Sequence, residues 1–121
     1  MTNKKTLVLG ASANPARYSN LAINQLRSKG HDVVAIGKRA GKVGDVEVAA
    51  EEKPIDNLDT VTLYLNANNQ KAYYDYIFSQ NPKRIIFNPG AENPELESLA
   101  KEKNILPMHA CTLVLLSTGQ Y

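Results

Sequence analysis

Two short apolar runs with a helical pattern between them constrain the fold of this chain more than any other feature. Residues 6–10 read Thr-Leu-Val-Leu-Gly and residues 33–37 read Val-Val-Ala-Ile-Gly, which is typical of strands buried on both faces of a parallel sheet. Between them, apolar residues recur at helical spacing over residues 19–30 and end at a glycine. The pattern predicts a strand–helix–strand unit with parallel strands and a right-handed crossover.

The rest of the chain continues this alternation. We expect one or two short strands in residues 38–58, a strand at residues 60–65, a helix at 69–80, a strand at 85–87, a helix opened by Asn93 and Pro94, and a short strand from residue 105. The apolar segment 112–117 fits a helix or a strand equally well. Alternating elements of these lengths predict an α/β fold: a Rossmann-like open, mostly parallel sheet with helices on both faces.

Composition narrows the function classes. The 121 residues fit a single domain, 1–121, and the formal net charge of +2 gives no reason to expect a nucleic acid or a membrane as partner. A single cysteine excludes an intrachain disulfide and a cysteine-based tetrahedral metal site. No signal-peptide pattern and no long apolar stretch is present, so we expect a cytoplasmic protein.

The loop from Gly10 to Asn20 joins the first strand to the first helix, where such folds hold phosphate against backbone N–H groups. Gly10 permits a sharp turn, and Ser12 and Ser19 carry hydroxyls. The guanidinium group of Arg17 can donate two hydrogen bonds to phosphate oxygens. Only the first glycine of the G-x-G-x-x-G pattern is present. The loop therefore predicts a phosphate site, although an ordinary strand–helix turn with a solvated arginine explains it too.

The end of the second strand bears on the ligand. NAD sites of this fold place an acidic residue there to bind the ribose hydroxyls, whereas this chain has Gly37-Lys38-Arg39. Two cations favour a ribose that carries an extra phosphate, as in NADP or coenzyme A. Alternatively, Lys38 and Arg39 belong to a solvated loop and bind no ligand.

Other residues give weaker signals. His31 follows a helix end and is expected to be a capping or surface residue, and Tyr73, Tyr74 and Tyr76 are expected to pack on the sheet. His109 and Cys111 follow the last strand and could approach the site from the carboxyl edge, but no orienting third residue can be identified.

Three stretches give the chain a family resemblance: Gly10-Ala11-Ser12-x-x-Pro15-x-Arg17-x-Ser19-Asn20, Val34-Ala35-Ile36-Gly37, and Phe87-Asn88-Pro89-Gly90-Ala91-Glu92-Asn93. On these residues, and on Ala110-Cys111-Thr112 near the end, it resembles the small stand-alone CoA-binding proteins related to the CoA-binding domain of succinyl-CoA synthetase. The likeness spans essentially the whole chain. It implies that the first loop holds the CoA diphosphate and that the adenosine lies by the second and fourth strands.

The resemblance also implies site residues. The phosphate-side residues are Ser12, Arg17, Tyr18, Ser19 and Asn20, and the adenosine-side residues are Gly37, Lys38 and Arg39. The remaining cofactor-binding candidates are Gly10, Ala11, Pro15, Leu65, Asn66, Asn88, Pro89 and Gly90. No catalytic and no metal-binding residue is predicted.

Three functions follow as hypotheses. The leading one is a non-catalytic protein that binds coenzyme A or an acyl-CoA. The second is an NADP-binding oxidoreductase or nucleotide sensor. The third is a regulatory subunit that joins a larger enzyme or forms a homodimer, suggested by the apolar tail Leu113-Val114-Leu115-Leu116.

Overall fold

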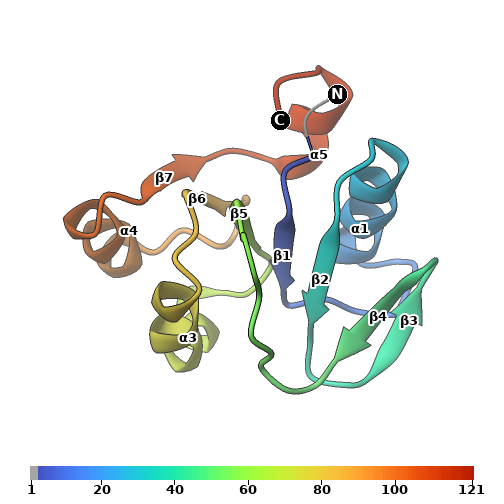
Figure 1. Cartoon of the computed structure of the whole chain (residues 1–121), viewed down its shortest axis with the longest axis horizontal. Helices are drawn as coiled ribbons and strands as arrows, with labels where there is room; N and C mark the ends of the chain where they lie inside the picture. Colours follow the sequence, from blue (N-terminus) through green and yellow to red (C-terminus); the bar gives the residue numbers. More distant parts are fainter. Residues whose placement is uncertain (1–2) are drawn as a thin grey trace.

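The computed structural model describes residues 3–121, so residues 1 and 2 of the expected 1–121 domain lie outside the described residues. The chain forms one seven-stranded sheet in the order β3-β4-β2-β1-β5-β6-β7 (Figure 1). Its strands are β1 (Thr6–Leu9), β2 (Val33–Ile36), β3 (Gly41–Val43), β4 (Val46–Ala49), β5 (Thr60–Leu63), β6 (Arg84–Phe87) and β7 (Leu106–His109). Only β3 runs antiparallel to its neighbour, and the other recorded pairings are parallel.

Helices follow most of the strands. They are α1 (Tyr18–Ser28), α2 (Ala67–Gln70), the 3₁₀ turn η1 (Lys71–Tyr73), α3 (Tyr74–Ser79), α4 (Pro94–Glu102) and α5 (Thr112–Ser117). Asn93 caps α4 by accepting a hydrogen bond from Leu96 N–H at 3.2 Å, with Pro94 in the first turn. No helix in residues 3–121 is long and apolar enough to cross a bilayer.

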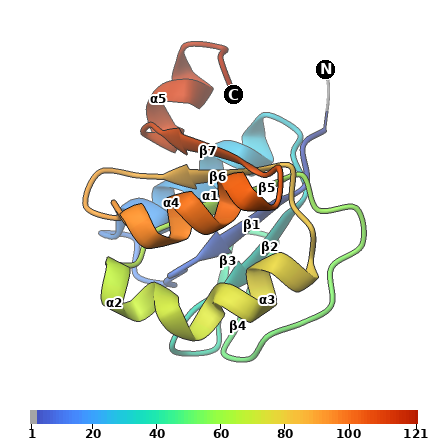
Figure 2. The ribbon, with the colours of Figure 1, turned by 90° about the vertical axis from the view of Figure 1, so that its left-hand side faces the viewer.

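The helices cover the two faces of the sheet (Figures 1 and 2). On one face, α1 and α5 contribute Ile23, Leu26 and Leu116 to a cluster that contains Val8 of β1. On the other face, α3 and α4 pack against the central strands in a larger apolar cluster. Strands β1, β5 and β6 are buried along their whole length. The second apolar run, β2, differs from the prediction of a strand buried on both faces, because Val33 and Val34 are partly exposed. The Rossmann-like α/β prediction is confirmed.

The strand order places a crevice at the carboxyl end of β1. The chain leaves β1 for β2 on one side and later returns to β5 on the other, so the direction of strand addition reverses at β1. Leu9 is in register with Ile36 of β2 and with Leu63 of β5, so the three strands end level with one another. Open α/β sheets bind ligands at such a switch point.

Two segments differ from the sequence prediction. The single helix expected over residues 69–80 starts earlier, at Ala67, and is divided by the turn η1. It starts there because the Asn66 side chain accepts a hydrogen bond from Asn69 N–H at 3.0 Å and caps the first turn. The unassigned segment 112–117 is the helix α5, which buries Thr112 and Leu116.

Candidate functional site

The loop after β1 is fixed at its start by the backbone. The N–H groups of Gly10 and Ala11 both donate to the carbonyl of Ile36, each at 3.0 Å. Gly10 has a φ of +87°, and a Cβ on it would lie 2.5 Å from the carbonyl oxygen of Tyr64. Only glycine fits this position, because a side chain would be strained by the left-handed backbone and would clash with the backbone of Tyr64, directly after β5.

The carboxyl end of β2 packs even more closely against the same loop. A Cβ on Gly37 would lie 2.1 Å from the carbonyl oxygen of Ala11, although the backbone of Gly37 has no unusual φ. Glycine is required here because two backbones approach each other with no space for a methyl group. The loops after β1 and β2 therefore form one rigid unit.

Side chains hold the remainder of the first loop. Ser12 Oγ accepts from Asn14 N–H at 3.1 Å, and Asn14 Oδ1 accepts from Ala16 N–H at 3.0 Å. Asn20, which is 5% exposed, donates from Nδ2 to the Ser12 carbonyl at 3.0 Å and accepts from Asn24 Nδ2 at 3.1 Å. These hydrogen bonds join the loop to the first turns of α1.

The amino end of α1 is open to an anion. No side chain caps the helix: Arg17 occupies the N-cap position and makes no capping hydrogen bond. Ser19 is only 3% exposed, and its hydroxyl has no hydrogen-bond partner among residues 3–121. Uncapped N–H groups and the positive end of the helix dipole favour a negative ligand at this point.

A cavity of about 1010 Å³ lies over these features. It is lined by Gly10, Ala11, Ser12, Ala13, Asn14, Arg17, Tyr18, Ser19, Gly37, Lys38, Arg39, Ala40, Tyr64, Leu65, Asn66, Asn69 and Tyr73. The lining carries three cations, Arg17, Lys38 and Arg39, and no acidic residue. Within the described chain, none of the three cations forms an ion pair, so their charge is available to a ligand.

Tyr64 forms part of the floor of the cavity. Its hydroxyl is buried without a hydrogen-bond partner in the described residues, and burial raises the pKa of Tyr64 to about 12. The phenol therefore stays neutral at ordinary pH. It can give or accept a hydrogen bond, but it does not add negative charge to the cavity.

Comparison with known proteins identifies the family. The family model described as CoA binding domain matches residues 4–117. This chain belongs to that family. Among proteins with curated descriptions, no relative matches the chain.

Solved structures support the fold of this CoA-binding domain. An uncharacterized protein with a crystal structure is 46% identical, with a TM-score of 0.96 and full coverage (100%) of both chains. A hypothetical protein from Pyrococcus horikoshii OT3 is 20% identical, with a TM-score of 0.86 over 96% of this chain and 83% of its own. A Thermus thermophilus protein, cell-free ID.343, is 19% identical, with a TM-score of 0.79 over 98% and 91%. The last two comparisons show the fold alone.

Most of the predicted cofactor residues of this CoA-binding domain line the cavity. They are Gly10, Ala11, Ser12, Arg17, Tyr18, Ser19, Gly37, Lys38, Arg39, Leu65 and Asn66. Pro15 and Asn20 belong to the same loop but are not part of the lining, and Asn20 instead holds the loop in place. The cavity thus brings together residues from the ends of β1, β2 and β5.

The loop after β6 lies outside the cavity lining. Asn88 is 3% exposed, and both ends of its amide are occupied: Nδ2 donates to Thr62 Oγ1 at 2.7 Å, and Oδ1 accepts from Thr112 N–H at 2.9 Å. Asn88 therefore joins β5, β6 and α5. Pro89 and Gly90 are exposed, and Gly90 N–H donates to the Glu92 carboxylate at 3.0 Å.

The lining also contains residues that the sequence did not identify as candidates: Ala13, Asn14, Ala40, Tyr64, Asn69 and Tyr73. Asn69 and Tyr73 lie on a helical segment, and a helical sequence pattern does not show which of its polar residues line a cavity. Their position could not be read from α-helical spacing, because the segment changes from α to 3₁₀ between Asn69 and Tyr73.

The histidines and the cysteine lie elsewhere. His31 is 6% exposed and accepts a hydrogen bond at Nδ1 from Lys4 N–H at 2.9 Å, so it is a buried structural residue. His109 Nε2 lies 2.5 Å from Glu97 Oε1 in an exposed pair, and no hydrogen bond joins His109 to Cys111 in residues 3–121. Neither His109 nor the partly buried Cys111 lines the cavity.

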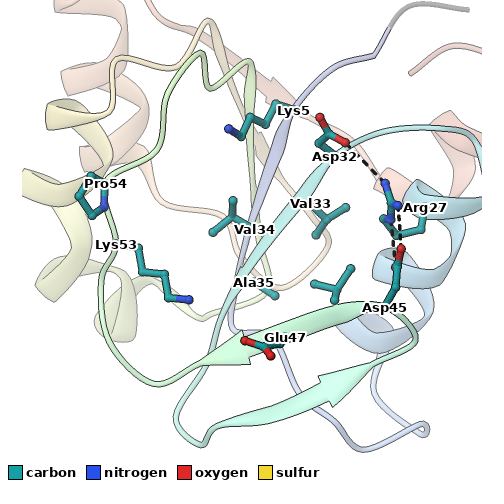
Figure 3. A pocket seen from close by; sticks show the side chains of 11 residues that line it. Lys5, Arg27, Asp32, Val33, Val34, Ala35, Asp45, Glu47, Lys53 and Pro54 are labelled. Atoms are coloured by element: carbon teal, nitrogen blue, oxygen red, sulfur yellow. Dashed lines mark hydrogen bonds and ion pairs between the residues drawn. The ribbon is translucent and has the colours of Figure 1, made fainter.

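A second, smaller cavity of about 450 Å³ lies between β2 and β4 (Figure 3). The two strands pair only from Ala35 onward, so their first residues diverge and leave a wedge. Arg27 closes one side by binding the Asp45 carboxylate through Nε and Nη2 at 3.1 and 2.7 Å. Cations and acids are mixed in this lining, so it lacks the single-sign charge of the larger cavity.

Proposed function

We propose that the chain binds coenzyme A in the larger cavity, with the diphosphate at the amino end of α1. The observation that carries the proposal is the lining itself: three cations without acidic partners beside an uncapped helix end. Ser19 adds a nearly buried hydroxyl without a partner in the described chain. Membership in the CoA-binding-domain family supports the choice of coenzyme A over other nucleotides.

Lys38 and Arg39 are proposed to bind the 3′-phosphate of the ribose. Both are exposed residues at the end of β2, and both line the cavity. An acidic residue at this place would bind the ribose hydroxyls of NAD, whereas two cations stabilise a phosphorylated ribose. We therefore expect coenzyme A to bind more tightly than dephospho-CoA, which lacks that phosphate.

We further propose that the chain has no catalytic activity of its own. Among the described residues that line the cavity there is no histidine, cysteine, aspartate or glutamate. Ser12 and Ser19 do line it, but a serine nucleophile needs an adjacent base, and the described lining has no histidine or carboxylate for that role. The function would then be to hold the cofactor, or an acyl-CoA, rather than to transform it.

Isothermal titration calorimetry tests the proposal with four ligands: CoA, acetyl-CoA, NADP and NAD. Saturable one-to-one binding of CoA or acetyl-CoA, with weaker binding of NADP and NAD, is the expected result. A clear preference for NADP would support the nucleotide-sensor or oxidoreductase alternative. Absence of any heat with CoA and acetyl-CoA at millimolar concentration would overturn the proposal.

A role as a partner-regulated subunit is a second proposal. Leu106 of β7 and Val114 of α5 are 55% and 56% exposed, so both apolar side chains are accessible to a partner. A homodimer or an enzyme partner would cover them. Light scattering at micromolar concentration tests the homodimer, and a pull-down tests the enzyme partner; a monomer without a captured partner contradicts the idea.

A further inference from the structure

The amino edge of the sheet, opposite to the cavity, contains a buried arginine without an acidic partner. Arg84 begins β6 and is 7% exposed, and it forms no ion pair in residues 3–121. Its Nε donates to Thr60 Oγ1 at 2.7 Å, and the Thr60 hydroxyl in turn donates to Asp59 Oδ1 at 2.7 Å. Its Nη2 is buried without a hydrogen-bond partner in the described residues. Because a buried charge is costly unless it is paired and hydrogen-bonded, Arg84 retains an unused donor and an uncompensated positive charge.

Tyr121 covers this arginine without neutralising it. The Arg84 guanidinium carbon lies 4.3 Å from the centre of the Tyr121 ring, which gives a cation–π contact but no opposite charge. The Tyr121 hydroxyl lies 2.5 Å from Thr6 Oγ1, at the start of β1 (Figure 1). Burial raises the pKa of Tyr121, against the opposing effects of Thr6, Arg84 and Thr60 beside its hydroxyl. The phenol is therefore neutral at ordinary pH.

Further polar groups surround the Tyr121 side chain. Lys4 Nζ lies 5.9 Å from the ring centre and donates to the main-chain oxygen of Tyr121 at 2.5 Å. The His31 ring lies 5.0 Å from the Tyr121 ring. The amino-edge recess, as we name the group around the Tyr121 ring, consists of Lys4, Thr6, His31, Thr60 and Arg84. Ammonium, guanidinium and hydroxyl groups are the donors with which proteins bind phosphate and sulfate.

The segment that carries Tyr121 can move without disturbing the sheet. Residues 118–120, which join α5 to Tyr121, are exposed. The last recorded main-chain hydrogen bond of this segment runs from Gln120 N–H to the Leu115 carbonyl at 2.8 Å. Beyond it, Tyr121 is held by its side-chain contacts and by Lys4. Rotation of the backbone after Gln120 would therefore lift the ring off the recess while α5 stays folded.

We propose that the amino-edge recess is a second binding site, for a small oxyanion such as inorganic phosphate, and that Tyr121 is its displaceable cover. The anion accepts hydrogen bonds from Arg84 and from the Thr6 hydroxyl that the phenol leaves, and Lys4 adds positive charge. None of the five recess residues lines the cofactor cavity. The inference therefore does not depend on the proposed function.

Amide-resolved NMR during phosphate titrations tests the site. Wild type and Tyr121→Ala are titrated at constant ionic strength, with chloride as the balancing anion. The amide signals of Thr6 and Arg84 report on the recess, and those of Ser12 and Ser19 report on the cavity, where phosphate is also expected. A cover that is displaced in about 10% of molecules or fewer lowers the apparent affinity about tenfold or more. Phosphate should therefore bind the recess of Tyr121→Ala about tenfold more tightly, or better, than that of the wild type.

Three further variants separate the cover from the site. Tyr121→Phe keeps the ring over Arg84 but loses the bond to Thr6, so its phosphate affinity should lie between those of the wild type and Tyr121→Ala. Gln120→Ala changes an exposed neighbour and should match the wild type. Arg84→Gln in the Tyr121→Ala background should lose the shifts at the recess and keep those at the cavity, with urea unfolding as the check that it folds.

The Tyr121→Ala titration decides the proposal even where the Arg84 variant fails to fold. Phosphate shifts confined to Ser12 and Ser19 would overturn this inference and leave the proposed function intact. Equal phosphate affinities of wild type and Tyr121→Ala would show that Tyr121 is not a cover, and equal shifts with chloride alone would show a general salt effect; both contradict the proposal. Saturable shifts at the recess in a chain that binds no CoA would overturn the proposed function alone.

Discussion

Replacing Gly37 by alanine tests whether the backbone contact between β2 and the first loop shapes the site. The added Cβ would lie 2.1 Å from the Ala11 carbonyl oxygen, 3.0 Å from the Ala11 carbonyl carbon and 3.4 Å from Val48 Cγ1. Ordinary carbon–oxygen contacts are about 3.3 Å, so the loop or the strand end must move by about 1 Å. Overpacking of this kind costs about 1–3 kcal/mol of stability.

The same displacement should weaken ligand binding. A shift of the Ala11 carbonyl moves the loop that carries Arg17 and Ser19 and strains the two hydrogen bonds to Ile36. Loss of one charge-assisted phosphate contact corresponds to about 1.5–3 kcal/mol, which is roughly 10- to 150-fold in affinity. Urea unfolding measures the stability, and calorimetry with CoA measures the affinity.

Gly30→Ala is the matched control for this substitution. Gly30 has a φ of +84° but no heavy atom within 4 Å of a new Cβ, so alanine should cost about 1–2 kcal/mol of stability through backbone strain alone. Its CoA affinity should equal that of the wild type. Wild-type stability and affinity in Gly37→Ala would refute the steric reasoning, and equal affinity losses in both variants would show that destabilisation alone is responsible.

Three other substitutions give distinct readouts. Arg17→Ala should weaken CoA binding by about 1.5–3 kcal/mol, measured by calorimetry, and an unchanged affinity would mean that Arg17 does not bind the phosphates. The double change Lys38→Ala and Arg39→Ala should lower the affinity for CoA but not for dephospho-CoA, and equal losses for both would remove the 3′-phosphate assignment. Burial, with the positive charges of Lys4 and Arg84, holds the pKa of His31 below its ordinary 6.5. The unfolded chain therefore takes up this proton first, and stability falls as pH drops below about 6.5 until the folded pKa is reached. His31→Gln should show a shallower fall in urea-unfolding free energy over that window, and superimposable pH profiles would contradict this account.

The sequence predicted the elements whose signals are local. The bounds of β1 and β2 match the two apolar runs, although only β1 is buried along its whole length, and Val33 and Val34 of β2 are partly exposed. The start of α4 follows from Asn93 and Pro94, whose capping chemistry is readable without the fold. In contrast, α5 could not be assigned from a six-residue segment with four apolar residues. Its buried start at Thr112 is bound to Asn88, 24 positions earlier in the chain.

The site residues that could be predicted from the sequence are those that directly follow a strand. Residues that follow β1, β2 and β5 line the cavity because the carboxyl ends of neighbouring parallel strands meet at one edge. Asn88 also follows a strand, but its amide is used within the fold, and only the hydrogen-bond partners reveal this. Asn69 and Tyr73 were missed because their position depends on the phase of a helix that changes from α to 3₁₀ between them.

A crystal structure of the chain with bound coenzyme A would show where each part of the cofactor lies. The diphosphate should lie at the amino end of α1, within hydrogen-bond distance of Ser19 and Arg17, with the 3′-phosphate beside Lys38 and Arg39. A diphosphate bound elsewhere, for example in the wedge between β2 and β4, would contradict this placement.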